Sequence, residues 1–150
     1  MEKIIVLSKI GSRNTDLVTE DDRRALRKTV GQANWASRLY RPDVSFYLME
    51  LSMKFNCPQK MDLGRANKVI DRLQTQAFSI LFPKLSDPKK IVTYSDASYG
   101  NLIDGVLCGH GHIIFLSDDN SRSAPLACTE KKVRCVITST LAAEDLSLHD

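Results

Sequence analysis

Apolar residues recur along this chain with two different periods. Between Thr19 and Ala77 they recur every three or four residues, as in helices that bury one face. From Lys89 onward, short runs of β-branched and aromatic residues alternate with turn residues, which is typical of strands. The change of period predicts an α+β protein in which a helical segment precedes a sheet, with a boundary loop at 83–88.

The first half of the chain predicts three helices joined by short links. The first begins at Thr19, which has capping-box spacing with Asp22, and it ends before Pro42. The second follows Asp43, which can cap it, and the third runs from about 62 to 76. We expect a joint core formed by the apolar stripes and by the aromatic and methionine side chains of the second helix: Leu26, Val30, Ala33, Ser37, Val44, Phe46, Tyr47, Leu48, Met49, Leu51, Met53, Phe55, Leu63, Ala66, Ile70, Leu73 and Ala77.

The second half predicts a three-stranded antiparallel meander followed by one helix. Before it, the alternation at Phe78–Phe82 indicates a short strand. The meander begins with a strand that leads to Asp96, and small and polar residues separate its members. Its further elements are a strand at 111–116, a hairpin-like turn at 117–121, a strand at about 124–128 and an alanine-rich helix that starts near Thr138. Residues 1–18 form a tail or an edge strand, with the strand at 3–7.

The composition is that of an ordinary globular chain with a small positive charge. Of 150 residues 43% are apolar, and the net charge of +3 permits a polyanionic partner without requiring one. No apolar run is long enough for a membrane span or a signal peptide. The four cysteines include no CxxC pair, which favours free thiols. We therefore expect an intracellular protein of the cytoplasm or nucleus, without a membrane partner.

Basic residues cover much of the predicted helical surface away from the apolar stripes. This pattern is first of all that of a solvated helix face, and it also fits contact with nucleic-acid phosphates. The sequence leaves both interpretations open. The candidate nucleic-acid-binding residues are Arg23, Arg27, Lys28, Arg38, Lys68 and Arg72.

Two carboxylates lie where the predicted fold could bring them together. Asp96 ends the first strand of the meander, and Glu144 lies in the first turns of the last helix. A helix that packs back across the strands would place Glu144 near Asp96. Carboxylates suit Mg²⁺, and a pair of divalent ions about 3.5–4 Å apart assists phosphodiester hydrolysis. The alternative is that Asp96 only caps a turn.

A second candidate site is the run Cys108-Gly109-His110-Gly111-His112. Strand alternation would place the cysteine and both histidines on one side, which invites a zinc site. A fourth ligand with the usual spacing is absent from the sequence, so we favour an ordinary strand.

These segments resemble, in order and spacing, part of the polymerase polyprotein of copia-type LTR retrotransposons, where the end of reverse transcriptase joins ribonuclease H. The resemblance extends over about residues 18–150. The matching stretches are VGQANW at 30–35, RPDVSF at 41–46, RANKVI at 65–70, YSDAS at 94–98, HIIFL at 112–116 and STLAAE at 139–144.

The resemblance implies a helical connection segment at 19–82 and an incomplete ribonuclease H-like domain at 89–150, with a three-stranded antiparallel sheet and one C-terminal helix. It implies that Asp96 and Glu144 are two of the four acids that hold Mg²⁺ or Mn²⁺ in that enzyme, which cuts the RNA strand of an RNA–DNA hybrid. The implied partners are such a hybrid, or other nucleic acid, and possibly the rest of the polyprotein.

The chain also departs from the family's pattern. The other two acids of the family lie beyond the last helix, and Asp150 points to a different helix face from Glu144. Cys128 stands where relatives carry tryptophan, and Cys135 where they carry a basic residue. We therefore expect a polyprotein fragment that is inactive by itself. The alternatives are a connector remnant without chemistry and a small basic nucleic-acid-binding module.

Overall fold

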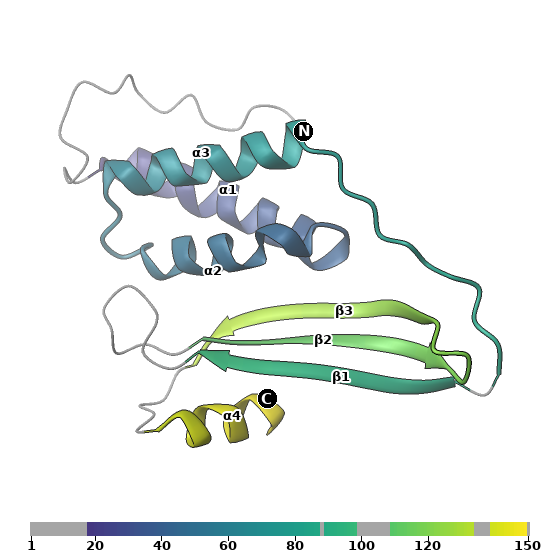
Figure 1. The fold of residues 1–150 in the computed structure, drawn as a ribbon. Coiled ribbons are helices and arrows are strands. Elements are labelled where there is room, and N and C mark those ends of the chain that lie inside the picture. Colours follow the sequence, from purple (N-terminus) through teal and green to yellow (C-terminus); the bar gives the residue numbers. More distant parts are fainter. Residues whose placement is uncertain (1–17, 88, 99–108, 134–138, 150) are drawn as a thin grey trace. The chain divides into compact units, whose positions relative to one another are not determined.

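A computed structural model describes residues 18–87, 89–98, 109–133 and 139–149 (Figure 1). The chain divides into two compact units, Met1–Phe78 and Ser79–Asp150. The predicted α+β order is confirmed: helices come first, and a three-stranded antiparallel sheet with one short helix follows. The predicted strand at 3–7 and the predicted helix start near Thr138 lie outside the described residues. None of the described helices combines the length and the apolar character that a bilayer crossing requires.

The helices of the first unit are α1 (Glu20–Leu39), α2 (Ser45–Met53) and α3 (Lys60–Thr75), with a 3₁₀ turn at Pro42–Val44. The predicted start of α1 is confirmed, because the Thr19 hydroxyl accepts a hydrogen bond from the Asp22 backbone N–H at 3.2 Å. The same hydroxyl donates to the Asp22 carboxylate at 2.9 Å. Tyr40 (φ −150°, ψ 0°) is already outside helical geometry, and Arg41 (φ −132°, ψ 57°) remains so, as expected for a residue before proline.

The core of this unit is made by one stripe from each helix, as predicted. Phe46, Tyr47 and Ala77 are exposed, however, so their assignment to the core is wrong. The buried cluster consists of Leu26, Val30, Ala33, Val44, Leu48, Leu51, Leu63, Ala66 and Val69, with Val18, Phe55, Ile70 and Leu73 packed against it.

Two helix starts differ from the predictions. Asp43 does not cap α2, since both of its carboxylate oxygens accept hydrogen bonds from arginines. Helix α3 begins at Lys60, before the predicted start. Its first turn is closed by Asp62, which is buried and accepts a hydrogen bond from the Gln59 backbone N–H at 2.9 Å. Asp62 therefore acts from inside the first turn, as the third residue of a capping box does.

The predicted strand at Phe78–Phe82 is wrong, because residues 77–87 form neither helix nor strand. Leu81 and Phe82 are 81% and 65% exposed, so the alternation buries no face. The ring of Phe78 instead lies 5.5 Å from the guanidinium carbon of Arg41.

The second unit is a meander of β1 (Lys89–Ser98), β2 (Gly109–Asp118) and β3 (Ser123–Lys132), followed by α4 (Thr140–His149). The order β1-β2-β3 is antiparallel throughout, as predicted, and the strands are longer than their apolar runs. A bulge in the β2–β3 pairing lies at Ile114 and Phe115. Helix α4 packs against β1 and β2.

The predicted hairpin turn between β2 and β3 is built around the buried carboxylate of Asp118. This carboxylate accepts hydrogen bonds from the backbone N–H groups of Ser86, Asn120 and Arg122, each at 3.0 Å, and from the Ser86 hydroxyl at 2.9 Å. Arg122 adds an ion pair at 2.9 Å. Ser121 completes the turn with a left-handed backbone (φ 61°). The turn therefore ties the end of β2 to the segment that precedes β1.

Candidate functional site

Asp96 lies near the C-terminal end of β1, with its side chain exposed. The residue opposite it on β2 is Gly111, and the next residue on the same face of β1, Ser98, is opposite Gly109. Directly opposed residues share a sheet face, so two glycines leave this part of β2 without side chains beside the carboxylate. The Ser98 hydroxyl is within 3.4 Å of the Gly109 carbonyl oxygen and 3.3 Å of its N–H. The surroundings of Asp96 are thus open and polar.

Glu144 lies in the second turn of α4 and is half-buried. The helix starts after Ser139, whose hydroxyl accepts a hydrogen bond from the Ala142 N–H at 3.2 Å. Ala143 and Ser147, which are fully and almost fully buried, lie on one face of α4 at helical spacing. Glu144 follows Ala143 and therefore borders this buried face. Among the described residues neither Glu144 nor Asp96 has an ion-pair partner.

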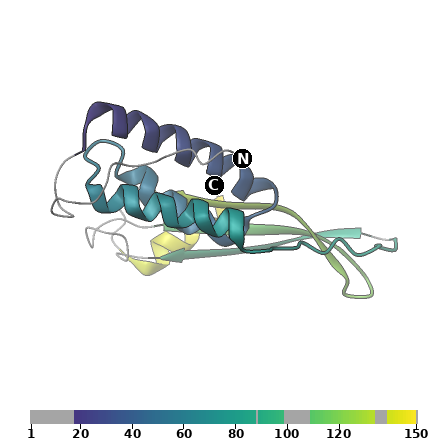
Figure 2. The ribbon, with the colours of Figure 1, turned by 90° about the horizontal axis from the view of Figure 1, so that it is seen from above.

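The two carboxylates lie on elements that are neighbours in space. Helix α4 packs against β1, and both Figure 1 and Figure 2 place the start of α4 beside the arrowhead of β1. Asp96 is close to that arrowhead, and Glu144 is close to that helix start. Within the described part of the chain, however, no three histidine, cysteine, aspartate or glutamate side chains form a group that could hold a metal ion.

Glu130 is a further carboxylate near Asp96 that the sequence did not reveal. It is opposite Gly111 on β3, so Asp96, Gly111 and Glu130 form one row on the same face of the sheet. Its Cγ lies 3.9 Å from the position that a Cβ on Gly111 would occupy. The side chain therefore extends over the glycine, which raises the negative charge along this row. Only the strand register could have identified it.

The histidines of the possible zinc site lie on the other face of the sheet. His110 and His112 are opposite Ala97 and Ser95 on β1, and their ring centroids are 6.4 Å apart. Alternation places them on the face opposite Asp96. Cys108 lies outside the described residues. The histidines therefore share a face, as predicted, and cannot join Asp96 in one site.

The basic residues of the helical unit differ in how far their charges are already used. Arg23 pairs with Glu20 at 3.2 Å, and Arg27 donates to the Phe55 carbonyl at 3.2 Å. Arg72 pairs with Asp43 at 3.1 Å. The other three predicted residues, Lys28, Arg38 and Lys68, are exposed, and no ion pair is recorded for them among the described residues.

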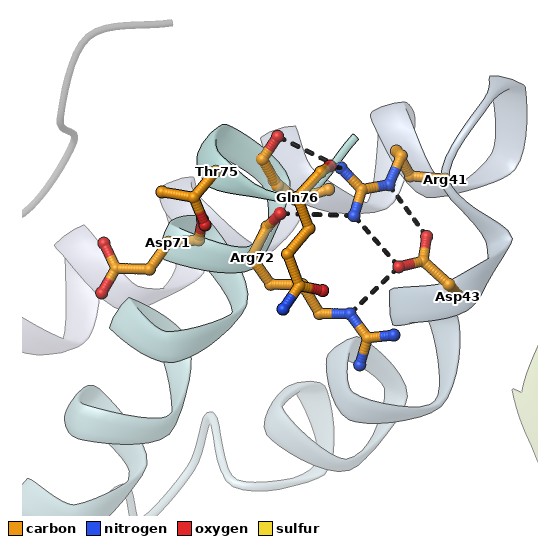
Figure 3. A network of polar contacts seen from close by, with 7 residues as sticks. Arg41, Asp43, Asp71, Arg72, Thr75 and Gln76 are labelled. Atoms are coloured by element: carbon orange, nitrogen blue, oxygen red, sulfur yellow. Dashed lines mark hydrogen bonds and ion pairs between the residues drawn. The ribbon is translucent and has the colours of Figure 1, made fainter. Parts of the chain in front are cut away.

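A polar network of the helical unit is centred on Arg41, which is only 5% exposed (Figure 3). Its Nε and Nη2 atoms donate to the two oxygens of Asp43 at 2.9 and 3.0 Å. Its Nη1 donates to the carbonyls of Leu73 and Gln76 at 3.1 and 3.3 Å, and Nη2 donates to that of Arg72 at 3.3 Å. One guanidinium thus binds three carbonyls at and just beyond the end of α3, of which that of Arg72 also accepts the Gln76 N–H at 3.1 Å.

The electrostatics of this network are mutual. Hydrogen bonds from Arg41 lower the pKa of Asp43, although partial burial opposes the shift. The same bonds raise the pKa of Arg41. The sequence Arg-Pro-Asp could have indicated the Arg41–Asp43 pair, because the proline fixes the backbone between an arginine and an acid two residues apart. No pattern in the sequence led to a prediction of this network. The contacts of Arg41 make it a structural residue.

A pocket of about 400 Å³ lies between α2 and α3. This size is within the range of small-molecule sites, about 300–1,000 Å³. Four of its lining residues are basic and two are acidic. The lining consists of Tyr47, Glu50, Leu51, Lys54, Asp62, Arg65, Lys68, Val69 and Arg72. The pocket includes two of the predicted nucleic-acid-binding residues, Lys68 and Arg72.

Compared with protein-family models, with characterised proteins and with solved structures, the chain shows no significant match.

Proposed function

We propose that the chain is a fragment of a copia-type retrotransposon polyprotein, and that its second unit derives from a ribonuclease H which hydrolyses the RNA strand of an RNA–DNA hybrid. The observation that carries the proposal is that the C-terminal end of β1, which bears Asp96, lies beside the start of α4. This arrangement is the one in which Asp96 and Glu144 could bind a common divalent ion. The motif resemblance supplies the chemistry, and the meander with its packed helix is consistent with it.

The residues present fit a divalent ion in part. Asp96 and Glu144 are hard oxygen donors without ion-pair partners among the described residues, and the two glycines beside Asp96 leave room for water ligands. Mg²⁺ or Mn²⁺ bound there would supply an activated water and stabilise the leaving oxygen. The contribution of the chain is to hold two carboxylates and to keep the strand face next to Asp96 free of side chains. Because Mg²⁺ is often bound by one or two carboxylates together with substrate phosphates, we expect weak binding without nucleic acid.

The basic surface of the helical unit would bind the phosphates of the hybrid. Lys28, Arg38 and Lys68 have charges that no recorded ion pair uses, so they are the strongest of the six candidates. Binding through phosphates and 2′-hydroxyls would select the shape of the duplex and not its base sequence. The rest of the polyprotein is a second proposed partner of the chain.

A non-catalytic role as a connector or a nucleic-acid-binding module is the second candidate. It is favoured by the basic pocket of the helical unit.

Manganese titration of the full chain, followed by paramagnetic broadening of NMR signals, tests the proposed metal site. The expected result is broadening of signals from β1 near Asp96 and from the start of α4, lost in Asp96→Asn and in Glu144→Gln. Asp119→Asn is the matched control, because it removes an exposed acid from the same unit in the β2–β3 turn. Equal broadening in Asp96→Asn and in the wild type would refute the proposed site.

Hydrolysis of a labelled RNA–DNA hybrid in the presence of Mg²⁺ or Mn²⁺ then separates the two candidates. Cleavage that Asp96→Asn abolishes would support the ribonuclease H function for this chain. Salt-sensitive binding of the hybrid without cleavage, unchanged in Asp96→Asn, would support the non-catalytic role.

A further inference from the structure

The pocket between α2 and α3 is formed by two facing rows of side chains. The first row lies on α2 and its C-terminal cap and consists of Tyr47, Glu50, Leu51 and Lys54. The second row lies on α3 and consists of Asp62, Arg65, Lys68, Val69 and Arg72. Both rows repeat every three or four residues, so each is one continuous helix face. The two helices run in roughly opposite directions (Figure 1). The pocket is therefore a regular feature of the helix pair and does not depend on a loop.

The charge of the pocket is positive and only partly neutralised. Asp62 is nearly buried, accepts the Gln59 N–H and lies 3.9 Å from Arg65. Arg72 pairs with Asp43 outside the lining. Lys54 and Lys68 are left, one on each wall, and neither has an ion pair recorded among the described residues. Two lysines on opposite walls can both reach an anion that enters between them.

The pocket also has an apolar floor and an exposed aromatic ring. Leu51 and Val69 are 3% and 6% exposed, so they form a closed floor. Tyr47 is 46% exposed although it lies on the same helix face, and Phe46 contacts it edge-on with ring centroids 6.0 Å apart. An aromatic ring held at the rim of a cationic pocket suits a ligand that combines a flat ring with an anion.

We propose that this pocket binds one nucleotide unit of single-stranded nucleic acid, with the base stacked on Tyr47 and the phosphate held by Lys54 and Lys68. Single-strand binding proteins combine these two features, aromatic platforms and cationic grooves. Glu50 argues against an acidic peptide, because several carboxylates would meet its negative charge. A nucleotide brings a single phosphate, and the base amino groups can donate hydrogen bonds to Glu50.

The inference does not depend on the proposed hydrolytic site. Every residue of the pocket lies in the helical unit, whereas Asp96 and Glu144 lie in the other unit. It shares with the proposed function the nucleic-acid partner and Lys68, which is also a candidate phosphate contact of the helical surface. Binding that survives Asp96→Asn but is lost with the pocket variants would separate the two.

Fluorescence anisotropy of a short labelled single-stranded oligodeoxyadenylate with the full chain tests the proposal. For Tyr47→Ala we expect affinity about 5- to 150-fold weaker, the usual loss of one stacked base, while Tyr47→Phe keeps the ring and the affinity. For the double variant Lys54→Gln/Lys68→Gln we expect the slope of log affinity against log salt to fall in magnitude by about 0.7, because the contact with one phosphate is lost. The charge-matched control Lys84→Gln/Lys132→Gln changes two exposed lysines of the other unit and should leave the slope unchanged.

Circular dichroism confirms that each variant is folded before its affinity is interpreted. Equal losses in the lysine control and in the pocket variant would overturn the proposal, since binding would then follow net charge alone. Wild-type affinity in Tyr47→Ala would overturn the stacking. Competition by polyglutamate or by inorganic phosphate as strong as that by unlabelled oligonucleotide would overturn the nucleotide assignment and leave a general anion site.

Discussion

The Arg41 network makes a quantitative prediction about the helical unit. Arg41→Ala removes five hydrogen bonds, two to the Asp43 carboxylate and three to carbonyls at the end of α3. Removing one partner of a buried ion pair costs about 3–5 kcal/mol. Asp43 would keep Arg72 as a partner at 3.1 Å, and the α3 carbonyls lie near solvent. The expected loss in the free energy of unfolding is therefore near the lower limit, about 3 kcal/mol.

The same carboxylate offers an internal comparison between a buried and an exposed partner. The side chain of Arg41 is 6% exposed and that of Arg72 is 38% exposed, and both donate to Asp43. Double-mutant cycles with Asp43→Asn measure each coupling. We expect about 1.5–3 kcal/mol for Arg41, as for hydrogen bonds to charged groups. For Arg72 we expect about 0.2–1 kcal/mol, as for surface pairs.

Urea unfolding of the full chain, followed by the far-ultraviolet signal and by Trp35 fluorescence, gives the required free energies. Trp35 is the only tryptophan of the sequence and lies on α1, so its signal reports on the helical unit. A unit of this size has a total stability of about 3–9 kcal/mol, so Arg41→Ala could unfold it. Arg41→Lys, or measurement in a stabilising osmolyte, then retains a folded baseline. A coupling for Arg72 equal to or larger than that for Arg41 would refute the argument from burial and geometry.

Three further predictions follow from contacts described above. Hydrogen bonding by the Ser86 backbone N–H lowers the pKa of Asp118, although burial opposes the shift. The ionised Asp118 carboxylate therefore stabilises the fold fully at neutral pH, and this stabilisation is lost as the pH falls below about 4. The free energy of unfolding should depend less on acid pH in Asp118→Asn than in the wild type, and an unchanged pH dependence would contradict this. Thr19→Ala should cost about 1 kcal/mol in urea unfolding, with Thr19→Ser nearly neutral, since only the hydroxyl caps α1. Ser121→Val should lower the stability of the β2–β3 hairpin by about 1–2 kcal/mol, because a β-branched residue disfavours its left-handed backbone, and protection of the hairpin amides from hydrogen exchange measures it.

The features that the sequence predicted well are those determined by local patterns. Helix α1 and the hairpin turn are recognisable because Thr19 and the run 117–121 act on neighbouring residues. The strand predicted at Phe78–Phe82 failed because a strand requires a partner, and alternation alone does not provide one. Phe78 shows what the pattern concealed, since its ring lies over the Arg41 guanidinium. Such a contact joins residues that are far apart along the chain, so it produces no periodic pattern in the sequence.

The sequence predicted which strand and which helix contribute to the candidate site, but it did not predict which side chains lie beside each other there. The sequence identified Asp96 and Glu144 by their places at a strand end and a helix start. The register then brought Glu130 into the row of Asp96, which no pattern within β3 could indicate. Likewise Gly109 and Gly111 became informative only when they were found opposite Ser98 and Asp96.

The roles of the basic residues, too, depend on contacts that the sequence does not show. The sequence treated six arginines and lysines as equivalent, but the structure separates them by their contacts. Arg27 holds the Phe55 carbonyl and Arg72 holds Asp43, so much of their hydrogen-bonding capacity stabilises the helical unit. Lys28 and Lys68 carry charges with no recorded ion pair and are available to phosphates. An ion pair must be broken or shared before an arginine can bind an anion. Substitution of the lysines without ion pairs should therefore lower nucleic-acid affinity, whereas substitution of the ion-paired and hydrogen-bonded arginines should lower the stability of the fold.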